Sequence, residues 1–354
     1  MVLAFGSTGM LRDGARMQDV RKAFPNAQVL GCSTAGEIAG TEVHDDSVVI
    51  TPVQFEHSGL KSAKIQMSEA KDSFDAGRML AEKLEPAGLV HVLVLSDGLK
   101  VNGSQLVKGL AAHLPAGVGV SGGLSADGAR FEKTFVCSGE TVEENVLAAI
   151  GFYGDRLKVR CASRGGWDMF GPERLVTRSK GNVLYELDGR SALQLYKTYL
   201  AEHAAQLPAS GLLFPLCVRS PEATAEGAVV RTILGVNEAD QSMTFAGDVA
   251  EGSYARLMRA NFERLIDGAQ DAAEATRAVG DLGNSELAIL ISCVGRKLVL
   301  KQRVEEEVEA VQEVLGAETV MTGFYSYGEI SPFTPSAKCE LHNQTMTITT
   351  FSER

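Results

Sequence analysis

Residues 31–38 read GCSTAGEI, and residues 323–330, near the other end of the chain, read GFYSYGEI. Each phrase follows a short run of strand-forming residues, at 27–30 and at 318–321. A strand that gives way to glycine, hydroxyl residues and then Gly-Glu is typical of a loop that lets backbones approach closely. Because α/β proteins bind ligands in loops at strand ends, the two phrases predict a duplicated unit with a pocket-forming loop in each copy.

The similarity extends over a longer unit, β-loop-α-β-loop-β-β, and a third copy of this unit lies between the other two. The predicted first strands of the copies are 2–6, 91–95 and 287–293, and the aligned loop glycines are Gly31, Gly122 and Gly323. Because this order mixes crossovers with hairpins, it predicts an α/β fold with mixed sheets and helices on their outer faces. We expect two lobes built from the repeated unit.

A stretch of different character separates the second and third copies. Pro208 and Pro215 mark the predicted boundary in it, which divides the chain into domains 1–207 and 208–354. Further along, the spacing of apolar residues predicts one long helix over about 252–278.

Composition limits the class of protein. The 354 residues are 45% apolar and 22% charged, as in an ordinary globular protein, and the net charge of −11 argues against nucleic acid or an anionic membrane as partner. No apolar run is long enough to span a membrane, and the N-terminus resembles a strand rather than a signal peptide. The six cysteines form no Cys-x-x-Cys pair, which is typical of reduced thiols in the cytoplasm.

Five motifs in order carry a family resemblance that covers nearly the whole chain. They are GCSTAGEI at 31–38, VTRSKGNVLYELDG at 176–189, FAGD at 245–248, FYSYGEI at 324–330 and CELHNQT at 339–345. On these motifs the chain resembles the FIST family, with both its N-terminal and its C-terminal domain. The resemblance implies a sensory domain that binds a small ligand in bacterial signalling and is not an enzyme.

One stand-alone branch of the family comprises haem-binding sensors of nitric oxide that act on histidine kinases and cyclic-di-GMP signalling. With no attached output domain, this chain is similar in layout to that branch. The resemblance therefore implies haem b as cofactor, nitric oxide as ligand, and a histidine kinase or a diguanylate cyclase or phosphodiesterase as partner.

The two loops supply most of the candidate ligand-binding residues. Backbone N–H groups and hydroxyls suit a carboxylate or carbonyl, and carboxylates suit an amine or a basic side chain. The candidates are Cys32, Ser33, Thr34, Gly36, Glu37, Tyr325, Ser326, Tyr327, Gly328 and Glu329, with Trp167, Arg231 and Asn343. Alternatively, the loops are tight strand connections with nothing bound, Trp167 covers the core, and Arg231 forms a structural ion pair.

Two histidines are candidate haem ligands. His342 lies in a predicted terminal strand over 341–351, where alternation places it on one face with Met346 and Ile348. His203 falls in a helical stripe with Leu193, Tyr196, Leu200 and Leu207. Each is otherwise an ordinary structural histidine, and haem b sites have no linear motif that would decide between these roles.

Three functions remain open at this point. The first is a haem-dependent sensor of nitric oxide, and the second is a receptor for an amino acid or a similar metabolite. The third, from another class, is an enzyme that uses Cys32 as nucleophile or the carboxylates of Glu37 and Glu329.

Overall fold

The three copies share one strand arrangement in the computed structural model, which describes residues 1–222, 228–277, 285–333 and 337–354. In each copy two parallel strands are joined through helices, and the last strand pairs antiparallel with the first. The parallel pairs are β1 (Val2–Gly6) with β2 (Val29–Ser33), β7 (Leu89–Ser96) with β8 (Gly119–Leu124), and β22 (Leu287–Cys293) with β23 (Val320–Ser326). The last strands are β5 (Val48–Pro52), β11 (Val146–Tyr153) and β26 (Met346–Glu353).

Each copy also gives a β-hairpin to the sheet of another copy. The hairpin β3 (Glu37–Ala39) and β4 (Glu42–His44) extends β23, β9 (Val136–Ser138) and β10 (Thr141–Glu143) extend β2, and β24 (Gly328–Pro332) and β25 (Cys339–His342) extend β8. Two further strands, β6 (Gly59–Gln66) and β12 (Leu157–Arg164), cover the edges of β11 and β26. The exchange closes a cycle of three sheets, which we call the central unit.

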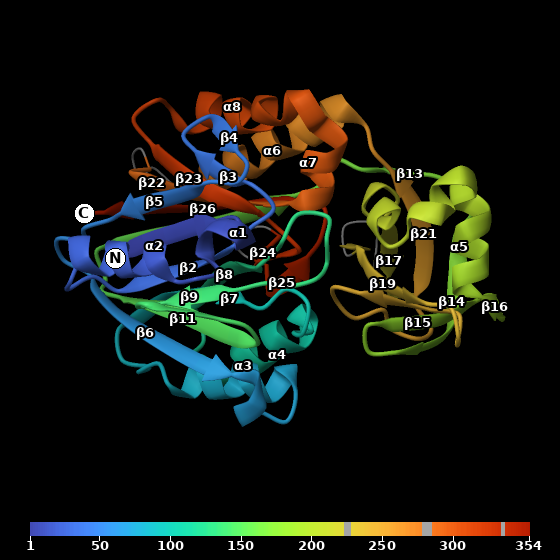
Figure 1. The fold of residues 1–354 in the computed structure, drawn as a ribbon, viewed down its shortest axis with the longest axis horizontal. Helices are drawn as coiled ribbons and strands as arrows, with labels where there is room; N and C mark the ends of the chain where they lie inside the picture. The colour runs from blue at the N-terminus through green and yellow to red at the C-terminus, as the bar shows by residue number, and fades with distance from the viewer. Residues whose placement is uncertain (223–227, 278–284, 334–336) are drawn as a thin grey trace.

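Helices cover the outer faces of these sheets, as Figure 1 shows for the top, bottom and front of the central unit. They are α1 (Thr8–Leu11) and α2 (Ala15–Ala23), then α3 (Ser73–Glu82) and α4 (Gly103–His113), and finally α6 (Phe262–Arg277), α7 (Val294–Leu300) and α8 (Val304–Leu315). The predicted α/β class with mixed sheets and outer helices is confirmed.

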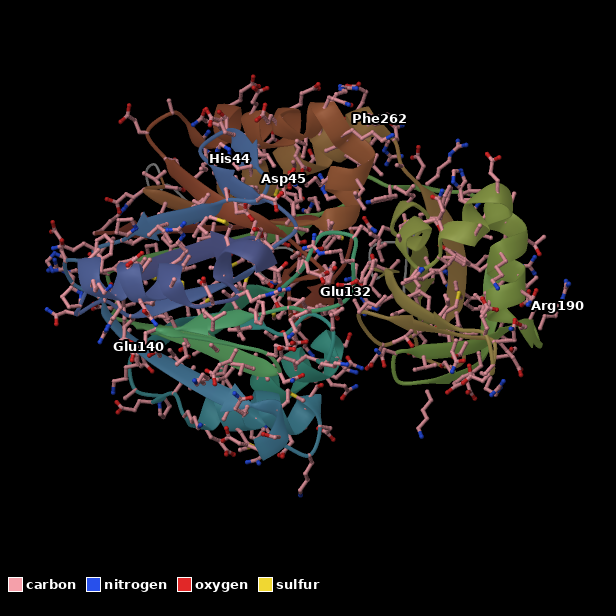
Figure 2. The ribbon with its side chains drawn as sticks, in the orientation of Figure 1. His44, Asp45, Glu132, Glu140, Arg190 and Phe262 are labelled. Atoms are coloured by element: carbon pink, nitrogen blue, oxygen red, sulfur yellow. The ribbon has the colours of Figure 1, made fainter. Side chains whose placement is uncertain are left out.

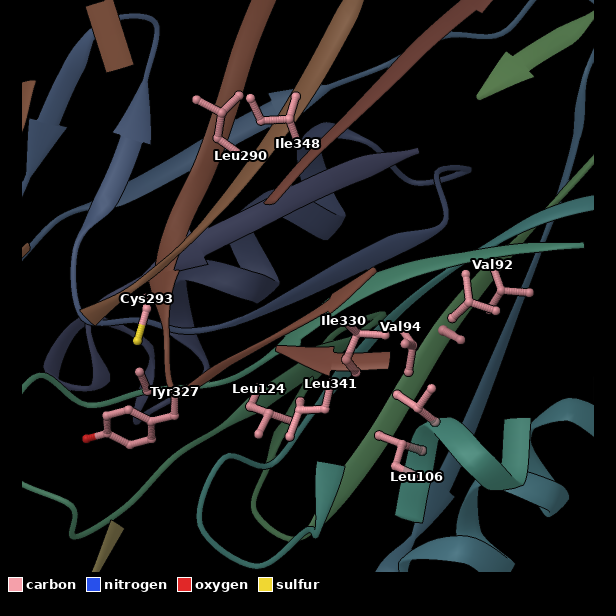
Figure 3. Close-up of a cluster of buried hydrophobic side chains, with 14 of the residues drawn as sticks. Val92, Val94, Leu106, Leu124, Leu290, Cys293, Tyr327, Ile330, Leu341 and Ile348 are labelled. Carbon is pink, nitrogen blue, oxygen red and sulfur yellow. The ribbon is translucent and has the colours of Figure 1, made fainter. Parts of the chain in front are cut away.

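Strand alternation builds two kinds of core in the central unit. Leu3, Leu93 and Ile289, which are equivalent in the three copies, meet in one buried cluster between the sheets. Their neighbours Val94 and Leu290 point the other way and pack in the largest cluster, together with residues of α3, α4, α6 and α8. Figure 3 shows part of that cluster, where Leu106, Leu124, Ile330 and Leu341 lie close together.

The stretch between the second and third copies forms a separate body, which we call the outer unit (Figure 1, right). Within the described residues its sheet has nine strands and packs against α5 (Ala192–Leu200) around its own apolar cluster. The strands are β13 (Asp168–Met169), β14 (Arg174–Lys180), β15 (Val183–Leu187), β16 (Arg190–Ser191), β17 (Leu216–Arg219), β18 (Val229–Arg231), β19 (Ile233–Asn237), β20 (Ser242–Phe245) and β21 (Tyr254–Arg259). All three copies of the repeat therefore lie in the central unit.

The division at 207/208 stays a prediction. Residue 208 lies between two 3-10 helices, η2 (Ala201–Gln206) and η3 (Ala209–Leu213), and the sheet of the outer unit takes strands from both sides of this point.

Two sequence predictions of secondary structure are wrong. The predicted helix over 252–278 begins only at Phe262, because residues 254–259 form β21, whose Ala255 and Leu257 alternate into the core of the outer unit. Its last residue, 278, lies outside the described residues. The predicted terminal strand over 341–351 is two strands, because Gln344 (φ 64°) turns the chain between them. His342 consequently lies in β25, away from the strand that holds Met346 and Ile348.

Candidate functional site

The glycines of the three repeated loops are required by the strand beside each of them. A Cβ on Gly31, Gly122 or Gly323 would lie only 2.0, 1.8 and 1.8 Å from the carbonyl oxygens of Ala4, Val94 and Leu290, respectively. These oxygens belong to the first strands β1, β7 and β22, so the same steric constraint recurs in every copy.

A ring of backbone hydrogen bonds joins the three loops. Each loop donates one N–H to the carbonyl of the next: Ala35 N to Tyr325 O (2.9 Å), Ala126 N to Ser33 O (2.8 Å) and Tyr327 N to Leu124 O (3.2 Å). The phrase that repeats in the sequence therefore marks the point where the copies contact one another.

The loop carboxylates of Glu37 and Glu329 are buried in matching hydrogen-bond networks. Each carboxylate accepts a hydrogen bond from the hydroxyl of the residue three positions before it in the sequence. Each also accepts two hydrogen bonds, from the N–H and from the hydroxyl, of the residue that immediately precedes the last strand of the same copy. Glu37 accepts from Thr34 Oγ1, Ser47 N (3.2 Å) and Ser47 Oγ (2.6 Å), and Glu329 from Ser326 Oγ (2.6 Å), Thr345 N (3.2 Å) and Thr345 Oγ1 (2.9 Å). Both carboxylates thus brace their own hairpins.

The burial of Glu329 makes stability depend on pH. Burial raises its pKa to about 8, although Ser326 and Thr345 oppose this shift. Because the folded state then holds a proton that the unfolded chain releases near pH 4.5, stability falls as pH rises from about 4.5 to 8. A tenfold change in proton affinity is about 1.4 kcal/mol, so the loss is on the order of a few kcal/mol.

We expect Glu329→Gln, which mimics the protonated acid, to flatten this part of the profile of melting temperature against pH. Glu353→Gln is the matched control, because the pKa of Glu353 is shifted in the opposite direction. Burial would raise this pKa, but hydrogen bonds from Ser58 and from the backbone of residues 56 and 57 outweigh burial and lower it. Equal slopes in the wild type and Glu329→Gln would contradict the prediction.

The other candidates in the loops are also buried and bonded within the central unit. Ser33 Oγ accepts from Phe135 N (2.9 Å), Tyr325 Oη donates to Glu307 Oε1 (2.7 Å), and Tyr327 Oη donates to Gly128 O (2.9 Å). Cys32 is fully buried, and burial, then Cys137 and Glu37, raise its pKa well above the usual range, so a thiolate is disfavoured.

Two loop glycines are also closely packed. Gly36 (φ 138°) packs against the side chain of Lys297. The Nζ of Lys297 donates to Ala35 O (2.9 Å) and forms an ion pair with Asp45, which is labelled in Figure 2. A Cβ on Gly328 would lie 2.9 Å from Leu124 Cδ1.

Trp167 and Asn343 lie where the outer unit joins the central unit. Trp167 Nε1 donates to Gln344 O (3.0 Å), and its ring packs in a cluster with residues of both units. Asn343 Nδ2 donates to Tyr327 O (3.2 Å), and its Oδ1 accepts from Thr232 N (3.3 Å) in the outer unit. Trp167 therefore covers a buried join between the units.

A cleft of about 1020 Å³ lies between the two units. One wall is α4 with the segment 114–120 and strand β25, and the other is β17, β18 and the segment 248–253. Of the predicted ligand-binding residues, Arg231 lines this cleft. The loop residues around Glu37 and Glu329 lie elsewhere, in the interior of the central unit.

The FAGD motif at 245–248 fastens the outer unit to α4 at this cleft. Asp248 accepts from Asn102 Nδ2 (2.8 Å), Gln105 Nε2 (2.5 Å) and Lys108 Nζ (2.8 Å). Burial raises the pKa of Asp248, but these donors outweigh it and hold the pKa below its usual value. A Cβ on Gly247 would lie 2.6 Å from Ser104 Oγ, so the glycine permits the close contact. The motif was visible in the sequence, but its partners on α4 were not.

Arg231 crosses from the outer unit to the central unit at the base of the cleft. Its Nε donates to Asp248 O (2.8 Å), and its Nη1 donates to Val230 O (3.1 Å) and Leu341 O (3.0 Å). The residue is 6% exposed, and burial lowers its pKa to about 10, so it remains a cation at neutral pH.

Neither candidate haem ligand lines the cleft, although His342 ends β25, whose other three residues do. His342 Nε2 is 2.9 Å from Ser331 O and is buried, and burial lowers the pKa of His342 to about 4. His203 lies in η2 with its ring 5.5 Å from Phe214. The described lining of the cleft contains no histidine, but it includes Cys339, whose Sγ donates to Val120 O (3.5 Å).

Two further features, a metal-binding cluster and a membrane-spanning helix, are absent from the described ranges. No group of three or more His, Cys, Asp or Glu side chains is arranged to hold a metal ion among residues 1–222, 228–277, 285–333 and 337–354. Over the same ranges, no helix has the length and hydropathy needed to cross a membrane.

The fold and the cleft define an α/β protein of three interleaved repeats that carries an inserted sheet unit. Family models for the FIST N domain and the FIST C domain match residues 1–190 and 192–332. The chain belongs to the FIST family, whose domains are sensors that bind small ligands in signal transduction.

The chain is also similar to an uncharacterized protein of Methanocaldococcus jannaschii, with 25% identity over 315 residues. The match covers 82% of this chain and 59% of that relative, so the chain spans little more than half of the relative's length. A weak structural match covers 84% of this chain and 99% of a cyanuric acid hydrolase from A. caulinodans. Its sequence identity of 12% and TM-score of 0.18 are too low to support an argument.

Proposed function

We propose that this chain is a sensor whose small ligand binds in the cleft between the central and outer units. The observation that carries the proposal is that both units supply walls of the cleft, and Arg231 and Asp248 connect them there. A ligand that contacts both walls favours one arrangement of the units over another, and a partner protein reads that difference.

Binding rather than catalysis suits the groups present. The Cys32 thiol is fully buried with a raised pKa, and the carboxylates of Glu37 and Glu329 are occupied by hydrogen bonds within their hairpins. None of these three residues lines the cleft. We therefore propose that the chain is not an enzyme, and that it works in the cytoplasm, where its free thiols stay reduced.

Haem b with nitric oxide is the more specific proposal, and the family resemblance alone supports it. The residues do not fit a haem iron held by His342, because its Nε2 is engaged with Ser331 O away from the cleft. Cys339 does line the cleft, but burial, then Cys161 and Glu340, raise its pKa well above the usual range, so it is a neutral thiol. An absorption spectrum after expression with haem supply tests this version: a stoichiometric Soret band that shifts with nitric oxide supports it.

The signalling partner is a proposal of the same kind. The resemblance implies a histidine kinase, a diguanylate cyclase or a phosphodiesterase, and a ligand-dependent change in partner activity is the measurement that tests it.

Filling the cleft tests the proposed binding site. Ala111 is an exposed residue of α4 in the cleft wall, so Ala111→Phe adds bulk there without disturbing the core. In a thermal-shift screen of small metabolites, we expect compounds that stabilise the wild type to lose at least tenfold in affinity for Ala111→Phe. Ala15→Phe, at an exposed position of α2 outside the cleft, is the matched control. Equal affinities for both variants would contradict the proposal.

A further inference from the structure

Arg231 is a buried cation whose hydrogen-bond partners are all neutral. Its three hydrogen bonds go to backbone carbonyls, and within the described residues it has no ion pair. Lys108 occupies the Asp248 carboxylate beside it. The carboxylates of Asp248 and Glu340 attract the guanidinium, but neither forms an ion pair with it. A buried cation without a contacting counter-charge is costly, so this part of the cleft has a place for an anion.

The guanidinium has one terminal nitrogen to spare. Nε and Nη1 are engaged, whereas Nη2 makes no hydrogen bond to the described part of the chain. Arg231 lines the cleft and is 94% buried. Because the bonds of Nε and Nη1 to both units hold the guanidinium in place, Nη2 is positioned and available to a ligand. Charge-assisted hydrogen bonds of guanidinium to carboxylate or phosphate oxygens are among the strongest that proteins make.

The rest of the cleft is largely apolar. Its walls include Val107, Ala111, Leu114, Val118, Val218 and Val229. The charged lining residues besides Arg231 are Lys108, Asp248, Lys338 and Glu340, and Lys108 and Asp248 neutralise each other. A volume of about 1020 Å³ is larger than a small polar metabolite needs and suits a ligand with a sizeable apolar body.

We infer that the cleft binds an amphipathic anion, with its carboxylate at Arg231 Nη2 and its apolar body along α4 and β17–β18. The inference rests on the proposed function and specifies the chemical class of its ligand. Because the head group contacts a residue of the outer unit and the body contacts α4, such a ligand bridges the two units.

Octanoate, octan-1-ol and acetate are the probes, measured by isothermal titration with Trp167 emission as a second signal from the join between the units. For the wild type we expect octanoate to bind at least tenfold more tightly than octanol or acetate. Arg231→Gln removes this preference but retains octanol binding, and Arg231→Lys restores part of it. Lys338→Gln, an exposed charge in the same cleft, is the matched control and changes octanoate affinity less than threefold.

The outcomes separate the two proposals. If Arg231→Gln does not fold, as judged by circular dichroism, Arg231→Lys carries the test, and unchanged octanoate affinity in it overturns the inference. Equal wild-type affinity for octanoate and octanol also overturns it. The thermal-shift screen can also yield neutral or cationic compounds that lose affinity for Ala111→Phe. This result would support the proposed function and reject the anionic class of ligand. Preferential binding of octyl phosphate over octanoate rejects the carboxylate.

Discussion

Arg296→Met is expected to lower the free energy of unfolding by about 3–5 kcal/mol, which is typical of breaking one side of a fully buried ion pair. Arg296 and Glu307 are both 0% exposed, with Arg296 Nη2 2.7 Å and Nε 3.0 Å from Glu307 Oε2. Arg296 also donates to Gly165 O and Leu265 O, each at 2.6 Å. The variant leaves a buried carboxylate without its counter-charge and removes the hydrogen bonds that Arg296 donates to the Gly165 and Leu265 carbonyls.

Urea denaturation measures this loss. Arg303→Met is the control, because Arg303 pairs with Glu263 and Glu306 at the surface, and its loss is expected to be much smaller. A variant that also carries Glu307→Leu, Tyr325→Phe and Ser292→Ala removes the stranded carboxylate and the two hydroxyls that donate to it, so it should regain part of the stability. Similar losses for Arg296→Met and Arg303→Met would contradict this account.

Gly323→Ala is expected to cost about 3 kcal/mol or more, because the new Cβ would lie 1.8 Å from Leu290 O on the neighbouring parallel strand. The atom that blocks the new methyl group is a backbone oxygen, which cannot rotate away as a side chain could. Strands β22 and β23 must therefore separate at residue 323, where the repeated phrase begins. The expected readouts are a lower melting temperature and a lower urea midpoint.

Gly235→Ala is the matched control for this steric effect. Gly235 also lies in a strand, β19, but an added Cβ there meets nothing within 4 Å. We expect its stability to stay within about 0.5 kcal/mol of the wild type. A loss as large as that of Gly323→Ala would contradict the steric account, because the lower entropy of the unfolded chain by itself favours alanine.

The sequence was most informative where one local constraint recurs. Gly31, Gly122 and Gly323 face the same carbonyl in each copy, so the repeat was readable, and with it the mixed sheets. By contrast, the apolar residues of segment 252–259 have a spacing that fits either a helix or a strand. The segment forms a strand because it pairs with β17, a contact that the sequence does not reveal. The exchange of hairpins is equally invisible in the sequence, because each hairpin is locally the same whichever sheet it joins.

The candidate site was harder to predict than the fold. Glu37 and Glu329 attracted attention because they repeat, but they repeat for a structural reason, the bracing of hairpins. The cleft is built from segments that carry no motif, such as 114–120, and from residues brought together by the packing of two units. Arg231 was identified because it precedes the FAGD motif, whereas its unengaged Nη2 depends on contacts that only the fold defines.

The cyclic exchange of hairpins sets an order of events during synthesis on the ribosome. Strand β8 ends at residue 124, but the hairpin that completes its sheet begins at residue 328, about 200 residues later. At 5–20 residues per second, this edge waits roughly 10–40 s for its partner. Throughout that time a nascent chain exposes an unpaired strand edge, the kind of surface on which chains aggregate. The chain itself therefore cannot cover the β8 edge until nearly all of the protein has been synthesised.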